Sequence, residues 1–390
     1  MMRTNRAVSF IVLLGVVSLF ADMTYEGARG ATGPFLASLG ASSLAVALIA
    51  GGGELIGYVL RLWSGRLADR THQYWALTAA GYAVNLLAVP LLALAGHWTV
   101  AAVLIVLERT GKALRTPARD AMLSYATATT GRGWGFGLHE ALDQIGATIG
   151  PFLVTAAMVG TASDYRRGFA VLLVPALLAL ATLTAAWRMF PRPEALEPRT
   201  VVVATDGFSR RYWVYLAGTC LVAAGFADYP LIAYHFAQAG TVPLAWIPGV
   251  YGLAMGVDAI AALAFGRAFD RIGLHVVVFA TVLGAAFAPL AFATAPGWAI
   301  PGMVCWGIGM GAQESVMRAA IATLAPAARR ATAYGLFNLA YGIAWFAGTA
   351  VMGGLYRWST TSVWVFSLVA QLAAVPVLWH AARAPISSES

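Results

Sequence analysis

The stretch Gly65-Arg66-Leu67-Ala68-Asp69-Arg70 returns in the second half of the chain as Gly266-Arg267-Ala268-Phe269-Asp270-Arg271. Each copy closes an apolar run. Two further pairs also match, and both lie in apolar runs: Phe20-Ala21-Asp22 with Phe226-Ala227-Asp228, and Gly137, Leu138 and Gly150 with Gly335, Leu336 and Gly348. All three pairs stand at equivalent places in each half, which indicates a duplicated chain built from parallel repeats.

The composition predicts a membrane protein. The 390 residues are 60% hydrophobic and 11% charged, with a mean hydropathy of +0.73. Apolar runs of about 20 residues, each long enough to cross a bilayer as a helix, recur along the whole chain. The sequence therefore predicts an all-α fold of twelve transmembrane helices in two pseudo-symmetric six-helix bundles, with spans at 8–29, 43–63, 74–95, 98–117, 133–159, 168–188, 212–236, 245–266, 273–294, 298–321, 332–355 and 361–383.

The positions of charged residues and prolines predict the domain boundary and the orientation of the chain in the membrane. Residues 188–211 contain Pro191, Pro193 and Pro198 and several arginines, which predicts a cytoplasmic linker between an N-terminal bundle at 1–187 and a C-terminal bundle at 212–390. Basic residues gather in alternate loops, so both termini are expected in the cytoplasm, with the protein in the inner membrane. A net charge of +8 distributed in this way indicates a lipid bilayer as the partner, and not nucleic acid.

The repeated loop resembles the loop motif between helices two and three of the major facilitator superfamily. Its motif residues are Gly65, Asp69, Arg70, Gly266, Asp270 and Arg271. The resemblance covers nearly the whole chain and implies two bundles around a central cavity, a monomer, and transport by alternating access. We expect these six residues to act as a conformational latch, in which aspartate caps a helix or pairs with an arginine.

Two further stretches are similar to one bacterial branch of that superfamily, whose members are mostly assigned as exporters. They are Arg109 to Ala121 and Gly131 to Gly137. Gly146, Gly150 and Pro151 also resemble the Gly-Pro motif of proton-coupled antiporters, although Val154 and Thr155 stand where that motif has further glycines.

Acidic residues inside the predicted spans are the main functional candidates. An ionised carboxylate in a bilayer is costly unless it is paired or faces water, and a buried one can carry a proton. We interpret Glu140 and Asp143 as the first choice for proton coupling or substrate binding, then Asp22, Glu26 and Asp228. The remaining candidates are Glu54, Glu108, Asp258 and Glu314. The alternative is that buried pairs with Arg29, Arg61, Arg109 or Arg318 only hold helices together.

Basic and aromatic residues complete the predicted site. Arg109 lies too deep to be a helix-end anchor, so it is a site candidate, whereas Lys112, Arg115 and Arg119 fit snorkelling at a cytoplasmic helix end. Further cavity candidates are Tyr25, Arg29, His139, Tyr229, His235, Phe337, Tyr341 and Trp345.

Other functional classes lack their signatures. The glycines from Gly131 to Gly137 follow no strand, and Lys112 has no nucleotide-binding loop around it, so ATP is not expected. We find no constellation typical of an enzyme, no metal site and no cofactor signature. The sequence predicts a secondary transporter, most simply a proton-coupled antiporter that exports a small cationic or amphiphilic molecule. The alternatives are a metal or organic-cation transporter with the acids as ligands, and an uncoupled lipid flippase.

Overall fold

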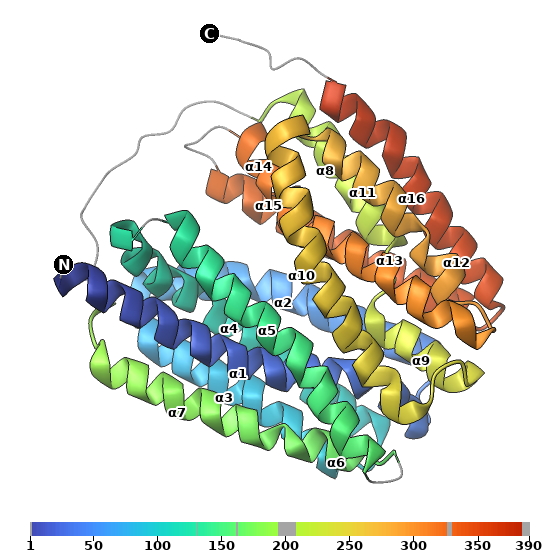
Figure 1. Ribbon diagram of the computed structural model, residues 1–390, viewed down its shortest axis with the longest axis horizontal. Helices are drawn as coiled ribbons and strands as arrows, with labels where there is room; N and C mark the ends of the chain where they lie inside the picture. Colours follow the sequence, from blue (N-terminus) through green and yellow to red (C-terminus); the bar gives the residue numbers. More distant parts are fainter. Residues whose placement is uncertain (1, 131, 161–162, 194–207, 326–329, 384–390) are drawn as a thin grey trace. The chain divides into compact units, whose positions relative to one another are not determined.

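The computed structural model describes residues 2–130, 132–160, 163–193, 208–325 and 330–383, and these are helical with no strand among them (Figure 1). Nine helical stretches in these residues are long and apolar enough to cross a membrane, and His275–Ala291 is a shorter apolar stretch. The helix α4 is not among the nine, because charged residues run along it. Most of the predicted linker, residues 194–207, lies outside the described part of the chain.

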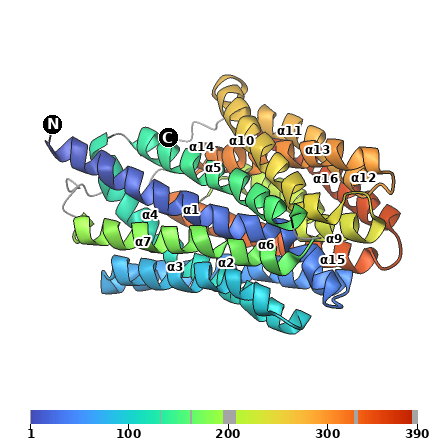
Figure 2. The same ribbon diagram turned by 60° about the horizontal axis from the view of Figure 1, so that its bottom comes forward.

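The helices form two compact units. Unit 1 contains residues 1–42, 52–200 and 242–252, and unit 2 contains residues 43–51, 201–241 and 253–390. The helices that lie wholly or mostly in unit 1 are α1 (Met2–Ser38), α2 (Ser43–Thr71), α3 (Tyr74–Leu91), η1 (Leu92–Leu94), α4 (Trp98–Thr130), α5 (Arg132–Val159), α6 (Tyr165–Val171) and α7 (Leu173–Met189). In unit 1, α1 runs beside α5 and α7 (Figures 1 and 2).

Unit 2 repeats the order with more interruptions. Its helices are α8 (Arg210–Gly225), α9 (Tyr229–Ala239), most of α10 (Ile247–Ile272), α11 (His275–Ala285), α12 (Phe287–Ala291), α13 (Ala299–Gly311), the π-helical turn η5 (Ala312–Val316), α14 (Met317–Leu324), α15 (Arg330–Leu355) and α16 (Thr360–Arg383). The short 3₁₀ turn η3 (Leu244–Trp246), which belongs to unit 1, precedes α10, and η4 (Pro296–Trp298) precedes α13.

Glycines of the repeat allow equivalent helices to touch in each unit. A Cβ at Gly150 of α5 would overlap the carbonyl oxygen of Met23 in α1. In unit 2, a Cβ at Gly348 of α15 would overlap the carbonyl oxygen of Ala224 in α8. Only glycine permits backbones to come this close, so the matched glycines mark the same helix crossing in both halves.

The helix α4 continues beyond the predicted span 98–117. The helix runs to Thr130 and not to 117, with Pro117 inside it. Proline has no N–H to give to the carbonyl of Ala113, one turn earlier. The hydroxyl of Ser64 in α2 donates to that carbonyl at 2.7 Å, and Gly65 lies against the Pro117 ring, where a Cβ on the glycine would be 3.6 Å from Cβ of the proline.

The predicted span 212–236 is broken in unit 2. The helix α8 stops at Gly225 and α9 starts at Tyr229, with Pro230 in its first turn. The carbonyls released by the break are satisfied by side chains: Ser367 donates to the oxygen of Gly225 at 2.6 Å, and Trp306 donates to the oxygen of Ala227 at 2.9 Å. The matching segment of unit 1, around Asp22, stays inside the continuous helix α1.

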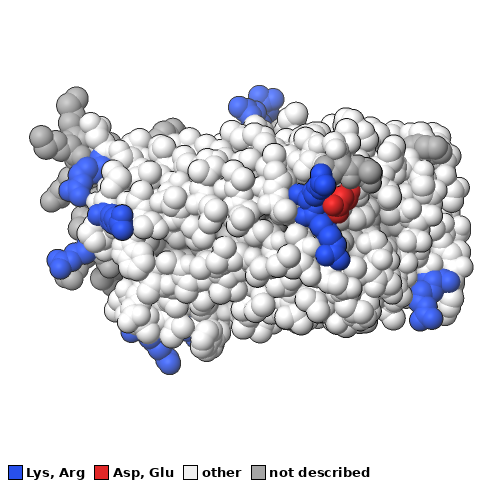
Figure 3. Space-filling model, turned by 90° about the horizontal axis from the view of Figure 1, so that it is seen from below, with Lys and Arg blue, Asp and Glu red and all other residues white. Residues whose placement is uncertain are grey.

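The outside of the protein is suited to lipid. On the face drawn in Figure 3 charged atoms are few, and broad uncharged areas separate them. Large apolar side chains such as Val103, Ile260 and Leu263 are more than half exposed. Such a surface is stable in hydrocarbon and would aggregate in water.

We predict that Gly150→Ala destabilises the protein by about 1–3 kcal/mol, because the new methyl group meets backbone that cannot move away. The measurement is the melting temperature of the detergent-purified protein. Gly57→Ala is the matched control on α2, since a Cβ there meets no heavy atom within 4 Å. Equal melting temperatures for the two variants would contradict the close crossing of α1 and α5.

Candidate functional site

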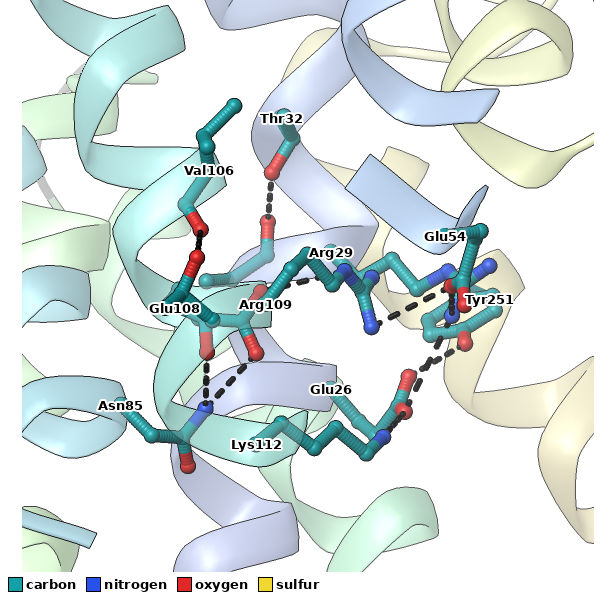
Figure 4. A network of polar contacts seen from close by, with 12 residues as sticks. Glu26, Arg29, Thr32, Glu54, Asn85, Val106, Glu108, Arg109, Lys112 and Tyr251 are labelled. Atoms are coloured by element: carbon teal, nitrogen blue, oxygen red, sulfur yellow. Dashed lines mark hydrogen bonds and ion pairs between the residues drawn. The ribbon is translucent and has the colours of Figure 1, made fainter. Parts of the chain in front are cut away.

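Ionisable side chains from three helices of unit 1 converge in its interior (Figure 4). Their side chains are 9% to 20% exposed. We call them the ion-pair cluster: Glu26 and Arg29 of α1, Glu54 of α2, and Glu108, Arg109 and Lys112 of α4. The residues of α1 are three apart and Glu108 and Lys112 are four apart, so helical spacing places each set on one face.

Glu54 is the centre of the ion-pair cluster. Its Oε1 atom lies 3.1 Å from Nη1 of Arg29 and 3.2 Å from Nη1 of Arg109. One carboxylate oxygen therefore links α1, α2 and α4. Gly53, next to Glu54, leaves room for the stem of Arg109, whose Cγ would be 3.1 Å from a Cβ at that position.

Glu108 is held from two sides. Nε of Arg109 lies 3.1 Å from its Oε2, and Nδ2 of Asn85 in α3 donates to its Oε1 at 2.8 Å. The same amide group lies 3.1 Å from the backbone oxygen of Glu108. Asn85 reaches this position because α3 and α4 cross closely: a Cβ at Gly111 would overlap the backbone nitrogen of Asn85.

Glu26 has three partners. Its Oε1 lies 3.7 Å from Nζ of Lys112 and 4.0 Å from Nη1 of Arg29, and Tyr251 donates its hydroxyl to Oε2 at 2.6 Å. Tyr251 is in the part of α10 that belongs to unit 1. The cluster thus combines three carboxylates with three cations, so it carries no excess of negative charge.

A second group, which we call the histidine group, lies around Ser18 of α1. Ser18 Oγ is 3.0 Å from Nε2 of His139 and 3.4 Å from the hydroxyl of Tyr82, and Arg119 donates to it from Nη1 at 3.1 Å. Nδ1 of His139 is 3.4 Å from Oδ2 of Asp143. A neutral imidazole that donates from Nδ1 to the carboxylate can accept the Ser18 proton at Nε2, so one tautomer satisfies both contacts.

Arg115 and Asp22 lie between these two groups. Arg115 is 1% exposed, with its guanidinium carbon 4.2 Å from the centre of the Tyr82 ring and 5.6 Å from that of Tyr25. Asp22 is 5% exposed, and a Cβ at Gly146 of α5 would lie 3.1 Å from its Cβ. The charged groups that act on Asp22 are Asp143, Lys112, Arg115 and Glu26.

The predicted residues of unit 2 comprise three acids and a set of aromatic side chains. Asp228 and Asp258 are each 1% exposed, and Glu314 is half-buried in the π-helical turn η5. The rings of Phe337, Tyr341 and Trp345 follow one another at 5.4 and 5.9 Å. Further contacts join Tyr341 to Gln313, Tyr229 to Trp306, and His235 to Tyr356.

Several predicted residues stand apart from the ion-pair cluster and the histidine group. Glu140 has an exposed side chain on α5, one turn from Asp143. Arg70 and Arg271 of the expected latch are exposed, and Gly266 has open space around it. The side chains of Asp69, Asp270 and Arg318, and residue Gly131 of the glycine run, lie outside what the structure describes.

The interpretation of Lys112, Arg115 and Arg119 as snorkelling residues is wrong. Arg115 is buried, the side chains of Lys112 and Arg119 are only 20% and 13% exposed, and the three contact Tyr82, Glu26 and Ser18 in unit 1. Sequence reasoning also missed Asn85, Tyr251, Ser18 and Tyr82. Asn85 carried a signal, because it is a polar amide in the middle of the apolar run 74–95. Among the described residues no group of three or more His, Cys, Asp or Glu could hold a metal ion.

A bundle of membrane-length helices with ion pairs in its interior is an architecture of membrane transporters. Residues 14–349 and 227–389 match the model of the Major Facilitator Superfamily, and the chain belongs to this superfamily of multi-pass membrane transporters. It is a transporter and not an enzyme.

Relatives and solved structures agree with this assignment. An uncharacterised protein of Mycobacterium tuberculosis is 41% identical over 96% of this chain and 93% of its own length. An uncharacterised transporter of the superfamily from Methanocaldococcus jannaschii is 24% identical over 92% of this chain and 91% of its own.

Among crystal structures, the nucleoside transporter NupG is similar at a TM-score of 0.76, with 12% identity over 95% of this chain and 99% of its own. A bacterial homologue of the lysosomal transporter Spinster is similar at 0.71, with 13% identity over 96% and 95% of the two chains. At these identities the likeness shows the fold, which confirms the predicted fold class.

We predict that Glu54→Gln destabilises the protein by about 3–5 kcal/mol, because the amide keeps an oxygen but removes the negative charge that the guanidinium groups of Arg29 and Arg109 share. Thermal unfolding in detergent measures the effect. The control is Asp164→Asn, which removes an exposed carboxylate but can still cap α6, and it should stay within about 0.5 kcal/mol of the parent. An equally small effect of Glu54→Gln would show that the cluster does not hold the helices together.

Proposed function

We propose that this chain is a proton-coupled antiporter that exports a small molecule by alternating access, with Asp22 and Asp143 as the proton-carrying groups. The observation that carries the proposal is geometric: Asp22 is buried and Asp143 is half-buried on helices that touch at Gly146, and Oδ1 of each is buried with no hydrogen-bond partner among the described residues.

The glutamates of the ion-pair cluster are poorly suited to carry the proton. Glu26, Glu54 and Glu108 each have a cation within 4.0 Å, and protonation would remove one half of a buried ion pair. Leaving a buried cation alone is strongly unfavourable. We therefore assign these three residues, with Arg29, Arg109 and Lys112, to holding α1, α2 and α4 together.

Asp22 and Asp143 are better suited than these glutamates to carry a proton. Neither has an arginine or lysine within ion-pair distance in the described part of the chain, and Asp143 instead contacts His139. A proton on one of them removes one of two neighbouring negative charges. His139, Ser18 and Tyr82 form a series of polar contacts that starts at Asp143, and such a series can pass a proton along.

The sequence supports the proposed direction of transport and the proposed location. Basic residues concentrate in the loops expected on the inner side, which supports a cytoplasmic-membrane protein with both termini in the cytoplasm. The likeness to a branch of exporters supports outward movement of the substrate in exchange for protons. Asp22 and Asp143 both belong to unit 1 of one chain, so the proposed proton site needs no second copy, and we propose a monomer as the working unit.

The proposal is tested in inside-out vesicles acidified by respiration and filled with a pH-sensitive dye. The probes are ethidium, tetraphenylphosphonium and the common amino acids, each added singly. We expect at least one probe to raise the internal pH in vesicles with the parent protein. Asp22→Asn and Asp143→Asn should reduce that response at least tenfold, because neither variant can release a proton at that position.

Asp164→Asn serves as the control for expression and insertion, since Asp164 is exposed and caps α6. Glu140→Gln, compared with Asp143→Asn, shows which of the two carboxylates of α5 is needed for the response. Loss of the response in Glu140→Gln together with retention in Asp143→Asn would contradict the assignment, as would a parent response that an uncoupler leaves unchanged.

A further inference from the structure

The buried residue Arg115 has donors that no protein group occupies. Its Nε and Nη1 atoms are buried without a hydrogen-bond partner in the described residues, and no ion pair of Arg115 is found there. The Tyr82 and Tyr25 rings that flank it stabilise the positive charge but accept no N–H in the guanidinium plane. A guanidinium with unused N–H donors can bind an oxyanion, which is the acceptor that forms its strongest hydrogen bonds.

Two carboxylate oxygens of unit 1 also lack partners. Oδ1 of Asp22 and Oδ1 of Asp143 are buried and make no hydrogen bond in the described residues. Their helices are in contact here, because Gly146, three residues after Asp143, lies against the Cβ of Asp22. Two such carboxylate oxygens on touching helices are suited to an ammonium group, which has three donors.

The donors and the acceptors belong to one place in unit 1. Tyr25, which lies beside Arg115, is three residues from Asp22 on α1. On the other side Tyr82, which also contacts Arg115, connects through Ser18 and His139 to Asp143. Arg115 also acts electrostatically on both Asp22 and Asp143.

We propose that the substrate is a small zwitterion, whose carboxylate or phosphonate binds Arg115 and whose amine binds between Asp22 and Asp143. This inference rests on the proposed function for the role of the two aspartates, since the amine then displaces the proton that they carry. The class of substrate follows from the donors and acceptors that lack hydrogen-bond partners.

Molecules of a single charge fit these atoms less well. A plain cation would leave the Arg115 donors empty and lie near the positive charges of Arg115 and Lys112. A plain anion would lie near the negative charges of Asp22 and Asp143. Only a molecule with both charges satisfies both sets, and polar groups left unpaired in a buried site discriminate strongly against analogues that lack one group.

The test is ligand binding to the purified protein in detergent at constant pH, with no gradient, measured as thermal stabilisation. The probes are the common amino acids and aminoethylphosphonate. For each amino acid that binds, two relatives are added: its amide, which keeps only the amine charge, and its N-acetyl form, which keeps only the carboxylate. We expect at least one zwitterion to bind, and both of its relatives to bind at least tenfold more weakly.

The variants locate the oxyanion site. Arg115→Gln should weaken the zwitterion about tenfold or more while leaving the weak binding of its amide unchanged, because the amide has no oxyanion to lose. If Arg115→Gln does not fold, Arg115→Lys, which keeps the positive charge, is measured in its place. Arg211→Gln is the matched control: Arg211 donates to the carbonyls of Ala381 and Ala382 in unit 2, far from this site in the sequence.

The inference is overturned if no zwitterion binds, if the amide or the N-acetyl form binds as well as the zwitterion, or if Arg115→Gln and Arg115→Lys both bind as the parent does. The failure of proton coupling is a separate result. Zwitterion binding that depends on Arg115, found together with vesicles that show no proton exchange, would keep this inference and remove the proposed antiport.

Discussion

The cost of keeping charge away from water is the constraint on which this structure depends. A carboxylate that stays ionised when buried needs cations and hydrogen-bond donors around it. Glu54 meets this condition by sharing one oxygen between Arg29 and Arg109, and Glu108 meets it with Arg109 and Asn85. Because these residues come from α1, α2, α3 and α4, neutralising the charge also fixes the positions of the helices.

The hydropathy of the sequence predicts the fold well, because the bilayer fixes the length of a span and backbone hydrogen bonding forces it to be helical. The exceptions depend on contacts between helices. The end of α4 is missed because the carbonyl freed by Pro117 is satisfied by Ser64 of another helix. The break between α8 and α9 is missed because Trp306 and Ser367, distant in sequence, satisfy the carbonyls that it exposes.

The candidate site is harder to predict from sequence. An acid within an apolar run shows that a charge is buried but does not show which partner neutralises it. Glu140 and Asp143 look equivalent in the sequence, since both lie in the same predicted span. The turn of α5 exposes one and brings the other to His139. Arg115 looks like a helix-end anchor until α4 is seen to continue to Thr130, which places Arg115 inside the protein.

The neutral charge of the ion-pair cluster matters for a protein that must change conformation. A carboxylate that holds a single cation loses its whole partner when helices move, and the penalty is several kcal/mol. Glu54 holds two, so α1 or α4 can shift while one guanidinium stays in contact. Ion pairs that share a carboxylate therefore lower the free-energy cost of moving the helices. The same number of separate ion pairs would raise that cost, because each would have to break completely. Asp22 and Asp143 lie outside these shared ion pairs, so in the proposed antiport their charge can change while the helices remain held together.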